Sequence, residues 1–188
     1  DLTSLGVWSF AYATISSINL PSTLKTIYGE AFTGSDLTSV TIPGNVELID
    51  NYAFTGNSKL TSVVISEGVK VLSYGLFSYC DQLQTLELPS TLIFMASELV
   101  RNCNNLTKVI SNMTEPIEIE GDVFSSRQNW NSSLGRYDYT PCPATLFVPN
   151  GTLSKYQSIE GWTVFKNMVE LGGVEAIIIG KSGKASYC

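Results

Sequence analysis

The chain has 188 residues, of which 44% are hydrophobic, and this length is sufficient for one ordinary domain or one repeat array with a substantial core. It carries 17 acidic and 11 basic side chains, and the net charge of −6 argues against nucleic acid and anionic membrane surfaces as partners, because both are bound through Lys and Arg. The chain contains no histidine, which excludes Ser-His-Asp and Cys-His catalysis and removes the usual zinc ligand.

Residues 1–127 are predicted to form an array of repeats, because an aromatic residue recurs along them at nearly constant spacing. The interval is 22 or 23 residues, and an aliphatic residue follows each aromatic position. The aromatic column comprises Phe10, Phe32, Phe54 and Phe77, with Val100 in the same place, and the aliphatic column comprises Ile15, Leu37, Leu60, Leu83 and Leu106. One such unit cannot bury its apolar face alone, so we expect neighbouring coils to stack around a continuous core.

Each repeat contains a predicted strand, in which apolar residues stand two positions apart. We expect these strands to pair as consecutive members of one parallel sheet. They lie near residues 18–20, 40–42, 63–65 and 86–88. The predicted fold class is a mostly β, α+β leucine-rich repeat solenoid, a right-handed stack of 22–23-residue coils with a parallel sheet and a C-terminal cap.

The array has irregular ends. Residues 1–10 match only the second half of a repeat, so either further repeats precede them in the native protein or they form a half-coil cap. After Leu106 the pattern decays, and the last repeat is degenerate. Residues 128–143, rich in Asn, Ser and Tyr, are predicted to be an inserted surface loop.

Residues 144–171 are predicted to be a C-terminal capping unit, since the outer face of the last coil must be shielded from water. We expect a strand at TLFVP, one or two short helices and a closing strand at MVEL, with Tyr156, Trp162 and Phe165 filling the open end. Residues 172–188 are expected to be a linker and the start of a further β segment. The longest apolar runs, such as EAIIIG, are too short to span a bilayer, so no membrane insertion is expected within this segment.

The repeats resemble the BspA-like leucine-rich repeats of bacterial surface and secreted proteins, whose units follow the form L-x-x-[VI]-x-[IL]-P-x-x-[VL]-x-x-[IL]-x-x-x-A-F-x-x-C-x-x-L. The stretch LTSVTIPGNVELIDNYAFTGNSKL follows that form closely. The unit LQTLELPSTLIFMASELVRNCNNL departs from it at Leu99 and Val100, where the family has Ala and Phe. The ending from Thr145 to Leu171 is also similar to the closing unit of such proteins.

This resemblance implies an extracellular or bacterial cell-surface location and adhesion to a host or microbial surface protein or glycan. It carries no catalytic residues to transfer, and it implies no cofactor or metal. Repeat scaffolds bind many different partners, so the family alone does not identify the ligand.

The candidate ligand-binding surface is the outward side of the predicted sheet, where two columns of residues alternate with the core positions. Its central members are Ser39, Thr41, Ser62, Val64, Thr85 and Glu87. Stacking would place these residues side by side on a rigid face. Small hydroxyl and β-branched residues also suit a strand that is merely solvated, so both interpretations remain open.

Trp8 and Tyr52 complete the set of candidate binding residues, and they share one column two residues before the aromatic position. Exposed aromatic side chains can stack on sugars or anchor protein partners. The alternative is that Trp8 and Tyr52 cover gaps between neighbouring coils.

Cys80 and Cys103 occupy the same position in successive repeats, a place where the family often has Cys. Stacked strands are about 4.8 Å apart and disulfide-bonded residues have Cα separations of about 4.4–6.8 Å, so geometry permits a bond. A column of unbonded, buried thiols is nevertheless the preferred prediction, because Cys is also a good small core residue.

Carboxylates cluster in TEPIEIEGD, which contains Glu115, Glu118, Glu120 and Asp122. Alternation would place Glu118 and Glu120 on one face of a strand, where they could bind Ca²⁺ or act as an acid–base pair. Because no second set of partners accompanies them, the preferred interpretation is a charge run on a solvated surface.

The leading functional hypothesis is an extracellular adhesion or recognition module that binds through the sheet face without catalysis. The alternative is a structural spacer that displays another domain of a larger surface protein.

Overall fold

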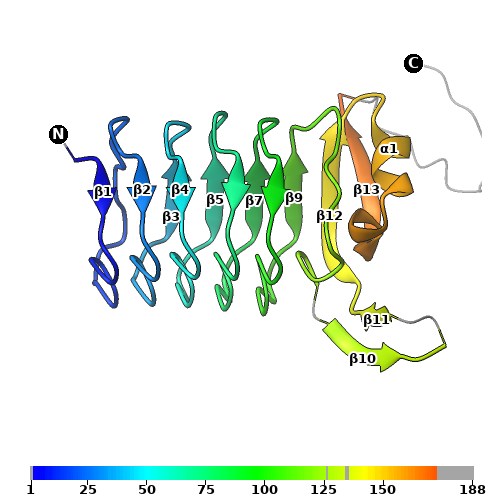
Figure 1. Cartoon of the computed structure of the whole chain (residues 1–188), viewed down its shortest axis with the longest axis horizontal. Coiled ribbons are helices and arrows are strands. Elements are labelled where there is room, and N and C mark those ends of the chain that lie inside the picture. Colours follow the sequence, from blue (N-terminus) through cyan, green and yellow to red (C-terminus); the bar gives the residue numbers. More distant parts are fainter. Residues whose placement is uncertain (1, 126, 134–135, 173–188) are drawn as a thin grey trace, which may run out of the picture.

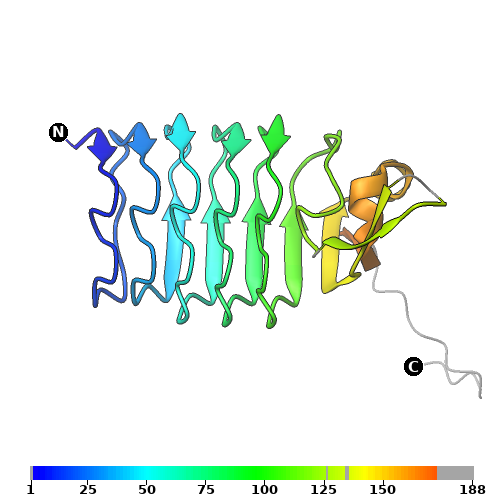
Figure 2. The ribbon, with the colours of Figure 1, turned by 60° about the horizontal axis from the view of Figure 1, so that its bottom comes forward.

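The chain folds as a solenoid whose coils stack along one axis, from β1 (Ser4–Leu5) at one end to β13 (Phe165–Leu171) at the other (Figure 1). The computed structural model describes residues 2–125, 127–133 and 136–172. Long strands and two-residue strands lie on separate sides of the coils (Figure 2). The predicted solenoid of stacked coils with a parallel sheet is confirmed.

The larger sheet has six strands in the order β13–β12–β9–β7–β5–β3, and every neighbouring pair is parallel. Besides β13, its members are β3 (Ser39–Ile42), β5 (Ser62–Ile65), β7 (Thr85–Leu88), β9 (Lys108–Ser111) and β12 (Cys142–Pro149). Buried and outward residues alternate along the strands, because successive side chains of a strand point to opposite faces. The predicted pairing of residues 40–42, 63–65 and 86–88 is confirmed.

The predicted strand near residues 18–20 is wrong, because this segment forms no strand. Hydrogen bonds to the next coil run from Asp36 N to Ala13 O (2.9 Å) and from Thr38 N to Ser16 O (3.0 Å), but no backbone hydrogen bond joins residues 17–20 to β3. Ile18 is only partly buried as a result.

Short strands form the opposite side of the coils. They are β1, β2 (Thr26–Ile27), β4 (Leu48–Ile49), β6 (Val71–Leu72) and β8 (Phe94–Met95). β1, β2 and β4 make one parallel sheet, and β6 and β8 make another. In each short strand one residue points into the core and its neighbour points outward.

The core between the two sides contains a column of stacked phenylalanine rings. The ring centroids of Phe10 and Phe32 are 5.1 Å apart, those of Phe32 and Phe54 4.9 Å, and those of Phe54 and Phe77 5.6 Å. Phe32, Phe54 and Phe77 are fully buried. Each buried ring contributes about 1.5–3 kcal/mol of hydrophobic stabilisation. Because rings from successive coils stack on one another, each coil shares its core with its neighbours.

Close contact between coils requires glycine at one turn. A Cβ atom added to Gly44 would lie 1.7 Å from the carbonyl oxygen of Glu67 in the next coil. No side chain fits there, and the two backbones touch directly.

The C-terminal end of the stack is closed by α1 (Leu153–Ser158), the 3₁₀-helix η1 (Glu160–Val164) and β13. Tyr156 and Trp162 are fully buried, with their rings 5.0 Å apart and edge to face. The Tyr156 hydroxyl donates to Met113 O (2.8 Å), and Trp162 Nε1 donates to Ile117 O (2.9 Å). The predicted short helices, closing strand and aromatic plug are confirmed. Among the described helices, none has the length and apolar character needed to cross a membrane.

The inserted segment between the last repeat and β12 contains an antiparallel hairpin of β10 (Arg127–Asn131) and β11 (Arg136–Tyr139). The hairpin projects from the side of the stack (Figure 1). Residues 128–143 therefore include paired strands and the start of β12, where the sequence predicts a loop. The further β segment predicted within residues 172–188, and Cys188 with it, lies outside the described residues except for Gly172.

Candidate functional site

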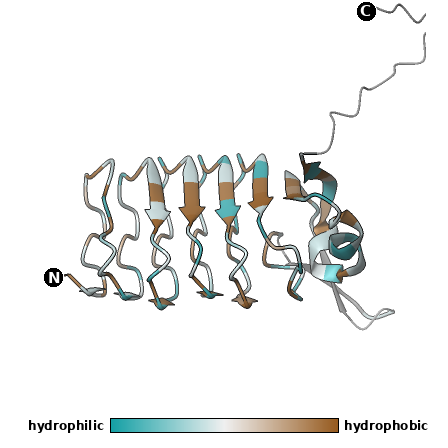
Figure 3. Ribbon diagram, turned by 90° about the horizontal axis from the view of Figure 1, so that it is seen from above, coloured by the Kyte–Doolittle hydropathy of each residue, from teal (hydrophilic) through white to brown (hydrophobic). Residues whose placement is uncertain are grey.

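Six of the eight candidate binding residues lie together on the outward side of the larger sheet. Strand register places Ser39, Ser62 and Thr85 side by side in one row. It places Thr41, Val64 and Glu87 in a second row. Neighbouring strands are about 4.8 Å apart, so each row presents one residue per coil at that spacing. Figure 3 shows both polar and apolar residues along these strands.

Both rows continue across strands whose residues the candidate set omits. The first row goes on through Lys108, Thr145 and Asn167, and the second through Ile110, Phe147 and Val169. The Lys108 ammonium lies 5.1 Å from the centroid of the Phe147 ring, which links the two rows by a cation–π contact. The alternating pattern of TLFVP is the sequence signal that marks Phe147 as outward, although it falls outside the repeat period.

The second row is the more apolar of the two. Val64, Ile110 and Phe147 are half-buried, and Val169 is 46% exposed. Glu87 interrupts this row, and its carboxylate accepts a hydrogen bond from Asn112 Nδ2 (3.2 Å). An apolar strip beside a row of mostly polar side chains can make both apolar contacts and hydrogen bonds with a partner.

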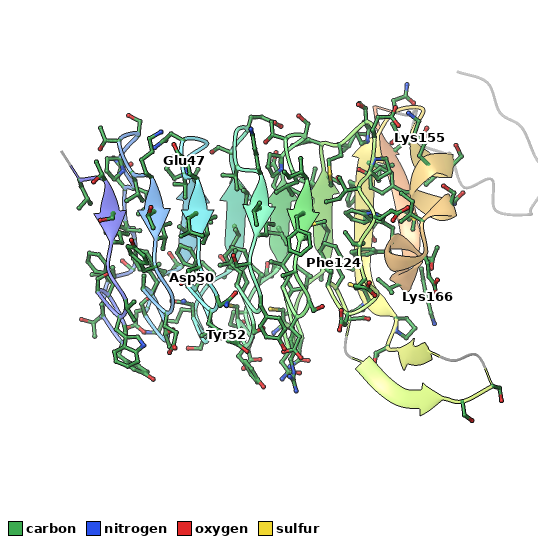
Figure 4. The ribbon with its side chains drawn as sticks, in the orientation of Figure 1. Glu47, Asp50, Tyr52, Phe124, Lys155 and Lys166 are labelled. Carbon is green, nitrogen blue, oxygen red and sulfur yellow. The ribbon has the colours of Figure 1, made fainter. Side chains whose placement is uncertain are left out.

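Trp8 and Tyr52 lie in the turns and not with the other six residues; Tyr52 is labelled in Figure 4. The Tyr52 ring covers Gly75 of the next coil, since a Cβ atom on Gly75 would lie 2.4 Å from it. Tyr52 also contacts Tyr74 edge to face, with ring centroids 5.4 Å apart. Covering the gap between coils is therefore one role of Tyr52, while Trp8 is 63% exposed and stays a candidate for binding.

The turns near Tyr52 contain a charged and aromatic cluster that sequence reasoning missed. Burial and the nearby Glu98 carboxylate raise the pKa of Tyr74 to about 12. Arg101 donates to both carboxylate oxygens of Glu98 at 2.9 Å, and its guanidinium lies 6.0 Å from the centroid of the Tyr79 ring. Tyr74 and Tyr79 come from one coil, and Glu98 and Arg101 come from the next. These residues occupy different positions within the repeat, so aligning the repeats does not bring them together in one column.

The cysteines form a structural column. Cys80 and Cys103 are buried and unbonded, which confirms the predicted thiol column, and Cys142 is a third buried free thiol. The thiols of Cys80 and Cys103 donate to the carbonyl oxygens of Phe54 (3.3 Å) and Phe77 (3.1 Å). Burial raises the pKa of all three, to about 12 for Cys103 and about 11 for Cys142. Thiols held protonated in this way are poor nucleophiles.

The predicted strand face for Glu118 and Glu120 is wrong, because residues 115–120 form no strand. Pro116 removes one N–H donor from this segment, which disfavours strand pairing. Both carboxylates are exposed, and they line a cavity of about 450 Å³ beside β8. Within the described part of the chain, no three His, Cys, Asp or Glu residues are grouped so that they could hold a metal ion.

Comparison with known proteins identifies the repeat type. A family model described as BspA type Leucine rich repeat region matches residues 1–131 in six copies. A leucine-rich repeat protein from Eubacterium ventriosum is 23% identical with a TM-score of 0.59, and the match covers 65% of this chain and 33% of that one. A leucine-rich repeat protein from Bacteroides ovatus is 23% identical with a TM-score of 0.53, covering 89% of this chain and 46% of that one. The chain thus spans less than half of each protein, and these likenesses show the fold. No curated protein matches the sequence significantly.

Proposed function

Because the chain belongs to the BspA-type leucine-rich repeat family, we propose that it is a recognition module that binds a protein or glycan through the outward face of its larger sheet. The family and the fold are those of interaction or structural proteins and are typically non-catalytic. We place the module outside the cell or on a bacterial cell surface, where it contributes to adhesion to host or microbial surfaces. The resemblance to BspA-like repeats, which are those of bacterial surface and secreted proteins, supports this location.

The observation that carries the proposal is the continuity of the two outward rows across six paired strands. Hydrogen bonding between strands holds the backbone of these residues in place before a partner binds, so little conformational entropy of this face is lost on binding. Phe147 is the only aromatic residue among the twelve described members of the two rows. Large aromatic anchors dominate tight interfaces, so we expect modest affinity.

The test is a variant in which Thr41, Ser62 and Thr85 are all changed to Lys. Thr41 is exposed and Ser62 and Thr85 are half-buried, so the long Lys stems can extend into water from all three positions and folding should survive. A matched variant changes Ser22, Ser58 and Ser154 to Lys, which adds the same charge at exposed positions outside the sheet face. Both are compared with the wild type for binding to matrix proteins, glycans and bacterial surface polymers.

We expect the sheet variant to lose binding to the panel ligand that the wild type binds through this face, and the matched variant to keep it. Equal binding by the wild type and the sheet variant would move the site elsewhere. The second candidate function is a structural spacer, and the scarcity of large outward side chains on the sheet favours it. Absence of binding across the whole panel would support the spacer.

A further inference from the structure

A cavity of about 450 Å³ opens beside the short strand β8. The short strands lie on the side of the coils away from the larger sheet (Figure 2). One wall is formed by β8 with the two residues that follow it, and the other by the segment 118–120 of the degenerate coil. Its lining residues are Tyr74, Phe94, Met95, Ala96, Ser97, Glu118, Ile119 and Glu120.

The cavity exists because the hydrogen bonding between successive coils is interrupted after β8. In earlier coils, Asp50 N donates to Ile27 O (2.9 Å) and Ala96 N donates to Leu72 O (2.8 Å). No backbone hydrogen bond joins residues 118–120 to β8, all of which the structure describes. Pairing resumes only where Glu98 N donates to Asp122 O (2.9 Å). The outer edge of β8 is therefore left open along the cavity.

The lining combines aromatic and apolar surface with negative charge. Phe94 is 54% exposed, and Met95 and Ile119 contribute aliphatic contacts. Glu118 and Glu120 are both exposed at the opposite wall, and no Lys or Arg lines the cavity. Arg101, a cation in the turn that follows β8, is already paired with Glu98. A cavity of this composition favours a ligand that is cationic at one end and apolar along its length.

We propose that this cavity binds a Lys- or Arg-bearing extended segment of a partner protein. The cationic head group lies between the carboxylates of Glu118 and Glu120 and the rings of Tyr74 and Phe94, and its alkyl stem packs on Ile119. The open edge of β8 offers backbone groups to an extended chain, as in other cases of strand addition. The net charge of −6 attracts such a segment at long range. This site is separate from the sheet face and does not depend on binding there.

The test uses a fluorescent peptide of alternating Lys and Val, together with a matched peptide in which Glu replaces Lys. Anisotropy titrations at low salt compare the wild type with the double variant Glu118→Gln/Glu120→Gln. A control variant, Glu47→Gln/Glu115→Gln, removes the same charge from exposed carboxylates outside the cavity. We expect about tenfold weaker binding of the Lys peptide by the cavity variant, and binding within about twofold of the wild type for the control.

A second pair of variants tests the aromatic wall without changing charge. Phe94→Ala should weaken binding of the Lys peptide several-fold, whereas Ile93→Ala, an exposed neighbour outside the lining, should not. Absence of binding by the wild type, equal binding of the Glu peptide, or equal losses in the two charge variants would each overturn the proposal. Val64→Ser on the sheet face should leave the peptide affinity unchanged, so this test and that of the sheet face succeed or fail separately.

Discussion

One buried position in four successive repeats is occupied by a small side chain that can donate a hydrogen bond. This column comprises Ser35, Asn57, Cys80 and Cys103. Asn57 Nδ2 donates to the carbonyl oxygens of Phe32 (2.9 Å) and Phe54 (2.7 Å), and the two thiols donate to the phenylalanine carbonyls of the coils before them. At three of the four positions the side chain supplies a donor for a buried carbonyl, and leaving such a group unpaired would cost about 1–3 kcal/mol. Ser35 donates instead to Asn57 Oδ1. Thiol chemistry itself is not required.

The buried thiols make the stability of the protein fall at alkaline pH. Folding raises the pKa of Cys103 from 9.0 to about 12, so the unfolded chain loses this proton first as the pH rises above about 9. The free energy of unfolding should then decrease by up to about 1.4 kcal/mol per pH unit for each such thiol. Cys103→Ser keeps the donor and removes the titration.

Denaturant unfolding at a series of pH values measures this effect. Below about pH 8 the wild type and Cys103→Ser should show parallel stability profiles, and above about pH 9 the variant should lose stability less steeply. Profiles that stay parallel up to about pH 10 would show that Cys103 titrates normally in the folded protein. Burial also raises the pKa of Tyr156 to about 12, but this residue is present in both proteins, so its contribution cancels in the comparison.

At the scale of the coil, stacking distance is limited by backbone contact in the turns. Gly44 meets the carbonyl oxygen of Glu67 in the next coil with no room for a Cβ atom. This backbone contact and the stacked phenylalanine rings join the same two neighbouring coils. A side chain at Gly44 would therefore push the two backbones apart and also weaken the contact between the rings.

Gly44→Ala should destabilise the protein by about 1–3 kcal/mol or more, because overpacking forces the backbone of two coils apart. Gly6→Ala is the matched control, since a Cβ atom there meets nothing within 4 Å. The control should change stability by less than about 0.5 kcal/mol. Chemical denaturation of both variants checks the difference, and equal values for the two would show that the coils tolerate separation at Gly44.

Repeat segments that hydrogen bond to the strand of a neighbouring coil could be predicted from the sequence, and segments that do not could not. Alternation at Val40 and Ile42 was sufficient to assign β3. The same alternation at Ile18 and Leu20 gives no strand, because no backbone hydrogen bond joins this segment to β3. The Glu118–Glu120 alternation fails for a related reason, since the degenerate coil does not bond to β8.

At the scale of the whole molecule, the stability of each coil depends on its contacts with the neighbouring coils, as in other solenoids. The plug of Tyr156, Trp162 and Phe165 lies at the C-terminal end of the stack and closes the core there. Its hydrogen bonds reach back to Met113 and Ile117 in the degenerate coil. Weakening the plug should therefore loosen the nearby strands before the distant ones.

Trp162→Ala should cost about 3–5 kcal/mol of stability by removing a fully buried indole. Native-state hydrogen exchange should show the largest loss of protection in β9, β12 and β13, and a smaller loss in β3 and β5. A uniform loss along all strands would mean that the array unfolds as one cooperative unit and that the plug has no local effect.

The candidate sheet face was found in part from the sequence. Ser39 and Thr41 were assigned to the outward side because strand alternation fixes the side of every second residue. Phe147 and Val169 extend the same rows, but they belong to β12 and β13, which follow no repeat period. The cavity beside β8 depends on hydrogen bonds that are missing, and no sequence pattern reports the absence of a bond.

The register of one residue per coil in each outward row has a consequence for how such proteins diverge. Duplication of one whole coil in the gene would lengthen both rows by one residue, about 4.8 Å, and leave every other side chain on its original side. Insertion of a single residue within a strand would instead turn the following positions to the opposite face. Recombination between repeats can therefore change the reach of the surface in fixed steps, while its chemistry changes independently by point substitution.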